Sequence, residues 1–190
     1  MRSARECVRC ASSCEARSGI DDVAACAKWL GRNGYGNARH LGIVGGSAGG
    51  FLMGLALTRN PDLYRAVVSE VGIFDLLRVE LTPNGAFNTP EFGTVKDPVQ
   101  FKWMLVQSPY HNVVKGRAYP AVLLTTGEND PRVAPYMSRK MIALLQADSS
   151  SPYPLLLIQH AGQGHGIGNS FQQNVEDATE VDTFFYSQLR

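Results

Sequence analysis

The stretch that decides the fold is Val44-Gly45-Gly46-Ser47-Ala48-Gly49-Gly50, in which four glycines surround a single serine. An apolar run precedes it and a helix-forming run follows it, so the turn joins a predicted strand to a predicted helix. A glycine-rich turn in this position either cradles a phosphate or exposes a serine. The phosphate interpretation is weak, because no lysine stands near Ser47 and the glycines miss the G-x-G-x-x-G spacing.

The same residues satisfy G-x-S-x-G, which is the pattern of a nucleophile elbow. In such an elbow the serine lies in a strained turn, and glycines remove side chains that would collide with the strand and the helix. The helix that follows directs the positive end of its dipole at developing negative charge. We expect the N–H of Ala48 to be an oxyanion donor. The simpler alternative is that Ser47 is an ordinary helix N-cap.

Two later residues are placed to activate this serine. A serine hydroxyl needs a base, and in this arrangement the acid and then the histidine follow on loops after later strands. Asp130 comes after a predicted strand at residues 121–126, and His165 comes after the next one. Both loops leave the C-terminal ends of strands, where open α/β sheets form their sites. We therefore predict Ser47, Asp130 and His165 as the catalytic residues.

Other acids and histidines compete for these roles. Glu128 is the alternative acid in the same turn, and Asp75 is a more distant one whose simpler interpretation is a turn cap. His160 ends a predicted strand, where it could pack, cap or replace the predicted histidine. His40 precedes the first strand, and His111 lies in a predicted turn.

Apolar and helical runs alternate along the chain. The predicted strands are at residues 41–44, 66–70, 121–126 and 153–159. The predicted helices are at residues 20–30, 47–59, 134–148 and 174–189, and residues 78–118 form an excursion with one helix near 97–107. This alternation predicts the α/β class, with a mostly parallel sheet and helices on both faces. The apolar continuity of AVLLTT and PLLLIQ predicts strands buried on both faces.

Length and composition indicate one globular domain at residues 20–190 after a poorly defined leader at 1–19. A net charge of +1 gives no reason to expect a nucleic-acid or membrane-surface partner. No apolar run approaches the roughly 20 residues of a membrane span, and no secretory signal is recognisable, so we expect a cytoplasmic protein. Cys7, Cys10 and Cys14 form C-x2-C-x3-C without a fourth ligand, so no metal and no cofactor is expected.

Four motifs, GGSAGG, GENDPRV, SPYHNV and GHG, together resemble the catalytic domain of the prolyl oligopeptidase family of serine hydrolases. The resemblance covers residues 20–190 and implies the α/β-hydrolase fold with Ser47, Asp130 and His165 as its triad. Family members carry a β-propeller before this domain, and a first half of the sheet that includes a tyrosine oxyanion donor. Neither is recognisable here, so we expect a truncated form of the fold, the C-terminal part of a family member.

The resemblance also implies residues that bind substrate. Arg132 would bind a substrate carbonyl, and Val133 and Ile73 would line the specificity pocket. Phe87 and Phe92 fall near the positions of aromatic residues that stack on a substrate proline. Because a phenylalanine stands where the family usually has tryptophan, strict proline preference is not expected.

These residues predict an acyl-enzyme hydrolase for a small ester or a short peptide. With one oxyanion donor, we expect short-chain esters to be cleaved better than amides, so the main prediction is an esterase. The alternatives are a prolyl-oligopeptidase-like peptidase and, in another class, a catalytically silent fragment or binding module. The strand at residues 41–44 would form an exposed sheet edge, through which we expect a homodimer.

Overall fold

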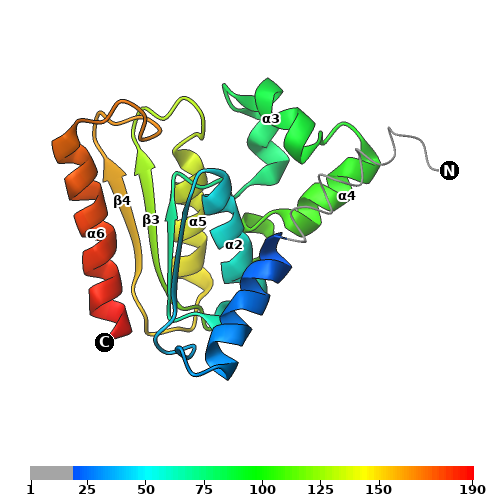
Figure 1. Cartoon of the computed structure of the whole chain (residues 1–190). Coiled ribbons are helices and arrows are strands. Elements are labelled where there is room, and N and C mark those ends of the chain that lie inside the picture. The colour runs from blue at the N-terminus through cyan, green and yellow to red at the C-terminus, as the bar shows by residue number, and fades with distance from the viewer. Residues whose placement is uncertain (1–18) are drawn as a thin grey trace.

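The computed structural model describes residues 19–190, which contain one four-stranded parallel sheet in the order β1-β2-β3-β4 (Figure 1). The strands are β1 (Gly42–Gly46), β2 (Ala66–Glu70), β3 (Ala121–Gly127) and β4 (Leu155–His160). All four follow the predicted apolar runs, so the predicted α/β class with a parallel sheet is confirmed. Because the strands are parallel, their C-terminal ends meet along one edge of the sheet.

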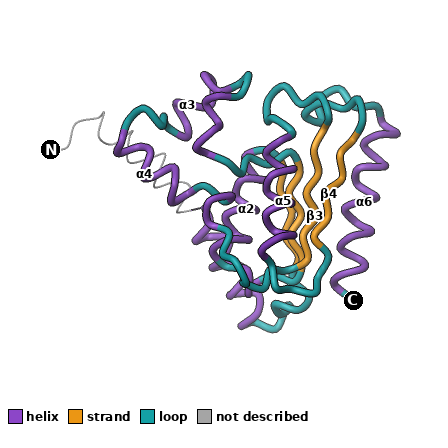
Figure 2. The backbone as a smooth tube through the Cα atoms, turned by 180° about the vertical axis from the view of Figure 1, so that it is seen from behind, coloured by secondary structure: helices purple, strands orange, loops and turns teal. Residues whose placement is uncertain are grey.

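Helices cover both faces of the sheet, so the sheet is the middle layer of the molecule (Figure 2). Since the spatial order of the strands follows the chain, right-handed crossovers leave the connecting helices on one face. That face is covered by α2 (Ala48–Arg59), α5 (Tyr136–Asp148) and a helix at residues 19–32, which share the larger apolar core. Helix α6 (Phe171–Leu189) follows β4 and covers the other face.

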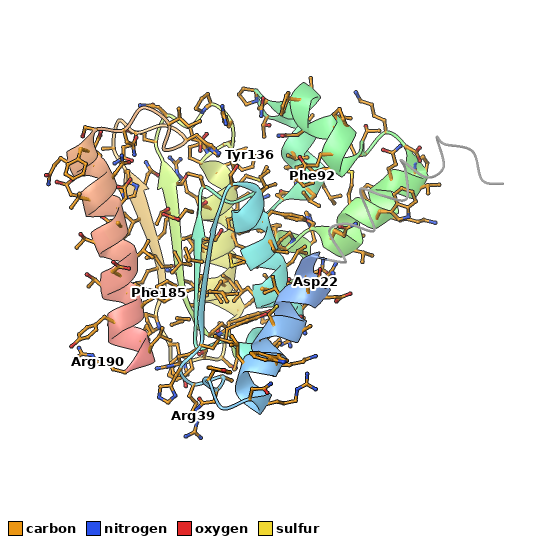
Figure 3. The ribbon with its side chains drawn as sticks, viewed as in Figure 1. Asp22, Arg39, Phe92, Tyr136, Phe185 and Arg190 are labelled. Carbon is orange, nitrogen blue, oxygen red and sulfur yellow. The ribbon has the colours of Figure 1, made fainter. Side chains whose placement is uncertain are left out.

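The smaller core lies under α6. Val181 and Phe184 of α6 pack on residues of β2 and β3, among them Val68 and Leu123. Phe185, labelled in Figure 3, reaches β1, where a side chain on Gly42 would lie 2.6 Å from its ring. This helix therefore closes the second face with large apolar side chains set against small residues of the sheet.

The two strands predicted to be buried on both faces differ. All seven residues of β3 are buried, as expected for a central strand. For β4 the prediction is wrong, because Leu156 is 46% exposed. Strand β4 is at an edge of the sheet, and α6 makes its main packing contacts with β2 and β3.

The excursion between β2 and β3 contains α3 (Gly85–Phe92), α4 (Pro98–Gln107) and the short helical turns Leu76–Leu81 and Tyr110–Asn112. A further turn, Pro61–Leu63, follows α2. Helix α4 begins as its sequence predicts, since the Asp97 carboxylate caps it by accepting hydrogen bonds from the N–H groups of Val99 and Gln100. Helix α3, which contains Pro90, was not predicted. It extends away from the sheet (Figure 1).

The predicted leader and its residues Cys7, Cys10 and Cys14 lie outside the described residues, apart from position 19. Helix α6 begins at Phe171, three residues before the predicted start. Among residues 19–190, no helix is both long and apolar enough to cross a bilayer. The cytoplasmic location stays a prediction.

Candidate active site

Ser47 lies in the turn between β1 and α2 with a backbone conformation that few serines adopt. Its φ of 56° and ψ of −117° put it outside the regions that side chains prefer. The turn is held on both sides, since the Ser47 N–H donates to the Glu70 carbonyl at 2.8 Å and the Ser47 carbonyl accepts from the Phe51 N–H at 3.0 Å. The strained turn predicted from the G-x-S-x-G pattern is therefore present.

The glycines of this turn are not equivalent. A side chain on Gly45 would lie 2.6 Å from the Gly49 carbonyl oxygen, and one on Gly50 would lie 2.8 Å from the Gly72 Cα. A side chain on Gly49 would meet open space. The predicted collision on the strand side therefore applies to Gly45, the first glycine of the G-x-S-x-G pattern. On the helix side the collision is at Gly50, and not at Gly49, which is the last glycine of the pattern.

The side chains of Ser47, His165 and Asp130 form one continuous chain of hydrogen bonds. The His165 Nε2 is 2.9 Å from the Ser47 Oγ, and the His165 Nδ1 is 2.7 Å from the Asp130 Oδ2. The His165 side chain is 7% exposed and that of Asp130 is fully buried. The Ser47 hydroxyl makes no capping bond to α2, so its interpretation as an ordinary N-cap is wrong.

Asp130 is fixed by the backbone that follows it. Its Oδ1 accepts hydrogen bonds from the N–H groups of Arg132 at 2.8 Å and Val133 at 2.9 Å. Burial alone raises the pKa of this carboxyl, but the hydrogen bonds from His165, Val133 and Arg132 outweigh burial and lower it below its usual value. The carboxyl is therefore an ionised acceptor at neutral pH, aimed at the imidazole.

A cavity of about 520 Å³ opens beside Ser47 and His165. Its walls are the C-terminal ends of the strands, the loop that carries His165, and the first half of α6. The cavity thus lies on the α6 side of the serine. The residues that line the cavity come from four parts of the chain: 46–47, 70–71, 125–127 and 160–182.

The competing candidates are occupied elsewhere. Glu128 accepts a hydrogen bond from the Gly162 N–H at 3.1 Å and supports the loop before the histidine. His160 pairs with carboxylates of α6. His40 is exposed and bonds Asn37.

Asp75 is neither part of the hydrogen-bonded chain nor a turn cap. Its buried carboxylate lies 2.5 Å from Lys140, 3.3 Å from Arg78 and 3.9 Å from His111. It makes no side-chain cap bond to the turn that follows it, so the capping interpretation is wrong. Its charge links Lys140 of α5 to Arg78 of the excursion.

The expected substrate-binding residues are only partly brought together. Val133 and Ile73 are buried in the larger core, on the α2 side of Ser47, and Phe92 packs edge-on against Phe51 there. Arg132 is exposed and follows Asp130 by two residues. Phe87 is 80% exposed on α3 and does not join them.

Sequence reasoning missed the polar residues that position the histidine loop. Asp177 of α6 accepts hydrogen bonds from Gln163 at 3.3 Å and from Asn169 at 3.2 Å, both in that loop. The only signal was the three-residue spacing of Asp177 and Glu180, which puts both on one helix face. Nothing in the local sequence says which loop that face meets.

Curated proteins are similar to this chain in sequence. The prolyl endopeptidase of Dictyostelium discoideum is 34% identical over 173 residues, which cover 90% of this chain and 23% of its own length. The dual function macrocyclase-peptidase of Amanita bisporigera is 36% identical over 173 residues, or 90% of this chain and 24% of its own. The chain therefore spans about a quarter of the length of the curated relatives it matches.

Solved structures agree with these relatives. A prolyl endopeptidase structure superposes with a TM-score of 0.86 at 36% identity and covers 90% of this chain and 25% of that one. Oligopeptidase B from Leishmania major superposes with a TM-score of 0.84 at 26% identity, with 88% and 24% covered. The sequence model described as the prolyl oligopeptidase family matches residues 15–190. The chain belongs to the prolyl oligopeptidase family and has its α/β-hydrolase fold.

Proposed function

We propose that the chain carries the acyl-transfer centre of a serine peptidase. The observation that carries this proposal is the unbroken hydrogen-bond chain of Ser47, His165 and Asp130 on a strained turn. Three side chains from separate loops meet with distances of 2.9 and 2.7 Å, within the range that proton transfer requires. A structural serine would need neither the positive φ nor the buried imidazole.

In the proposed reaction His165 takes the proton of Ser47 as the oxygen attacks a substrate carbonyl. Asp130 holds the imidazole in orientation and stabilises the imidazolium that forms, while its own proton count does not change. Ala48 is the first residue of α2, so its N–H has no partner within the helix and is the proposed oxyanion donor. His165 gives the Ser47 proton to the leaving nitrogen or oxygen as the substrate bond breaks and the acyl-enzyme forms. It then takes a proton from the water that attacks the acyl-enzyme and passes it to the Ser47 oxygen as the acid product leaves.

Peptide bonds are the proposed natural substrates. The relatives that cover this chain are described as prolyl endopeptidases and prolyl oligopeptidases, which favours the peptidase alternative over the esterase prediction. No such description favours short esters in particular. Esters remain suitable test substrates. Loss of one oxyanion donor raises the activation free energy by about 3 kcal/mol, and esters, with their better leaving groups, depend less on this stabilisation than amides do.

The side of the serine that faces α2 and α5 is the proposed position for the substrate side chain. Val133, Ile73 and Phe92 offer apolar surface there, and the exposed Arg132 is the proposed partner of a substrate carbonyl. Phe87 is set aside, because its exposure on α3 gives it no contact with this group.

A substrate panel tests the proposal. The purified chain is given p-nitrophenyl acetate, p-nitrophenyl butyrate and a chromogenic proline-containing peptide, with Ser47→Ala as the control. We expect turnover of the esters and slower cleavage of the peptide after proline, all lost in Ser47→Ala. Ester turnover that persists in Ser47→Ala would reject Ser47 as the nucleophile. Ester turnover without any peptide cleavage would restore the esterase prediction.

A further inference from the structure

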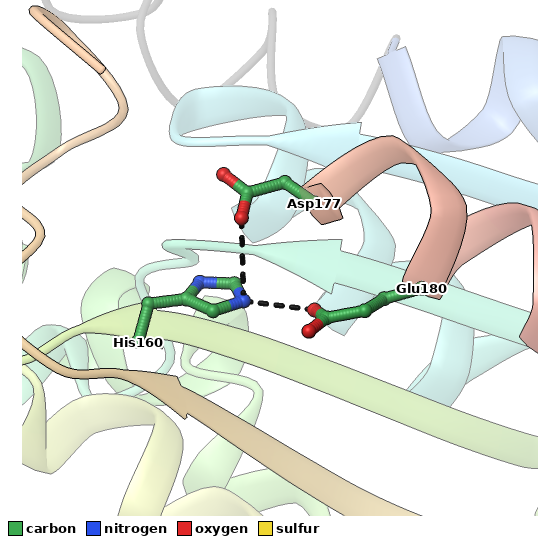
Figure 4. A group of neighbouring side chains, drawn as sticks. All are labelled: His160, Asp177 and Glu180. Carbon is green, nitrogen blue, oxygen red and sulfur yellow. Dashed lines mark hydrogen bonds and ion pairs between the residues drawn. The ribbon is translucent and has the colours of Figure 1, made fainter. Parts of the chain in front are cut away.

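A second cluster of ionisable side chains lies beside the cavity, apart from the hydrogen-bond chain of Ser47; its His160 and Asp177 line the cavity wall. His160 ends β4, and its Nε2 is 2.8 Å from the Glu180 Oε2 and 3.5 Å from the Asp177 Oδ1 (Figure 4). The two carboxylates come from one face of α6 and point at the same imidazole nitrogen (Figure 4). All three ligand-type atoms lie within 4.8 Å of one another.

These separations suit a single small cation. A tetrahedral Zn²⁺ site has metal–ligand bonds of about 2.0–2.1 Å, so its ligand atoms stand about 3.3–3.4 Å apart. The observed 2.8 and 3.5 Å lie on either side of that value. A shared ion would therefore require the His160–Glu180 contact to open slightly, while the atoms of all three side chains stay within reach of one ion.

The charge around the cluster favours a cation as well. The cavity is lined by the carboxylates of Glu70, Asp177 and Asp182, and none of the lining residues within 19–190 is a lysine or an arginine. The described wall beside the cluster is therefore acidic, which attracts a cation.

The cluster also has the supporting contacts that metal ligands require. Ligating carboxylates are normally held by further hydrogen bonds. Here the Asn169 amide donates to the second oxygen of Asp177 at 3.2 Å, and the Gln163 amide donates to the first at 3.3 Å. Both amides belong to the loop that carries His165, so an ion at the cluster would tie that loop to α6.

We propose that His160, Asp177 and Glu180 form a binding site for a divalent transition-metal ion of the Zn²⁺ class, beside the cavity that Ser47 and His165 line. One imidazole nitrogen with two carboxylate oxygens is a donor set that suits Zn²⁺ better than Ca²⁺ or Mg²⁺, which take oxygen ligands. Three protein ligands leave a fourth position for water. The site departs from the expectation, drawn from the cysteines, that no metal is involved.

The experiment measures Zn²⁺ binding by isothermal titration calorimetry on the untagged full chain. The parent protein for this experiment carries serine at Cys7, Cys10, Cys14 and Cys26, so that thiolates do not bind the ion. Every variant is made in this parent. His160→Ala and Glu180→Gln test the cluster. Two matched controls remove a histidine elsewhere: His40→Ala at an exposed site, and His165→Ala in the hydrogen-bond chain of the serine.

We expect one Zn²⁺ per chain, with affinity at least about tenfold weaker in His160→Ala and in Glu180→Gln and unchanged in both controls. We also expect Zn²⁺ to raise the melting temperature of the parent by more than that of Glu180→Gln at the same Zn²⁺ concentration. If His160→Ala does not fold, Glu180→Gln decides. The proposal is overturned if the parent binds no Zn²⁺, or if His165→Ala abolishes binding while the cluster variants retain it. Neither result depends on hydrolytic activity.

Discussion

Ser47 holds a conformation that costs free energy, and its neighbours supply the contacts that keep it there. Non-glycine residues at positive φ cost about 1–3 kcal/mol. Within residues 19–190 only Ser47 and Val71 have this geometry, and both line the cavity. The concentration of strain at the proposed nucleophile fits a site in which exposure of the hydroxyl matters more than stability.

The two glycines after Ser47 make a matched pair. We predict that Gly50→Ala lowers the free energy of unfolding by about 1–3 kcal/mol, because the new methyl group meets the backbone of Gly72 and Glu70. Gly49→Ala meets open space in a helix and should raise the free energy of unfolding by about 0.5–1 kcal/mol. Urea denaturation of both variants tests this. Equal effects of the two would contradict the assigned close approach.

Asp130 couples the site to acid stability. Its pKa is lowered in the folded chain, so its ionised form adds stability that is present above the ordinary value of 3.8 and lost as the pH falls through the lower folded value. Asp130→Asn cannot make this contribution. We predict that the variant is less stable than the parent at neutral pH, and that the difference narrows as the pH falls below 3.8. Chemical denaturation across this range measures it, and a constant difference counts against the assignment.

At the scale of elements, α6 depends on its first turn. The Ser170 Oγ accepts a hydrogen bond from the Gln173 N–H, and the Gln173 side chain accepts one from the Ser170 N–H. We predict that Ser170→Ala lowers the free energy of unfolding by about 1 kcal/mol. Ser187→Ala, near the other end of α6, is the control and should cost less, because its hydroxyl bonds only within the helix. Thermal denaturation that does not separate the two variants would reject the capping role.

The same elements mark how far local sequence carries a prediction. Strand β2 was predicted at its observed limits, because its apolar run is short and bounded. The early start of α6 could have been predicted from the S-x-x-Q capping pattern at Ser170. The exposure of β4 could not, since apolar continuity does not reveal which strand lies at an edge. The pairing of His160 with Asp177 and Glu180 joins a strand to a helix that begins after an intervening loop, so no local pattern encodes it.

The order of the site residues along the chain was more informative than any single motif. The elbow, the acid and the histidine each follow a different predicted strand, and parallel strands bring those ends together. The positions of Phe87 and Phe92 came from the resemblance alone. Only Phe92 lies near the serine turn, because α3 carries Phe87 away from it.

At the scale of the whole molecule, both outer strands have one unpaired edge among the described residues. On β1, Val44 is 49% exposed, and we predict a homodimer through this strand. Light scattering should give a dimer that becomes a monomer in Val44→Lys. Leu156→Lys places the same charge on the opposite edge strand and should leave the dimer intact. A parent that is monomeric at every concentration tested would end this prediction.

The central claim is that Ser47 is a nucleophile activated by His165 and Asp130. Labelling with a fluorophosphonate, followed by intact mass and peptide mapping, tests it most directly, because the reaction requires no knowledge of the natural substrate. We predict a single adduct on Ser47, absent from Ser47→Ala and formed far more slowly in His165→Ala. A folded parent that remains unlabelled would contradict the claim and favour a catalytically silent domain. An adduct on another residue would contradict the claim by assigning the nucleophile elsewhere.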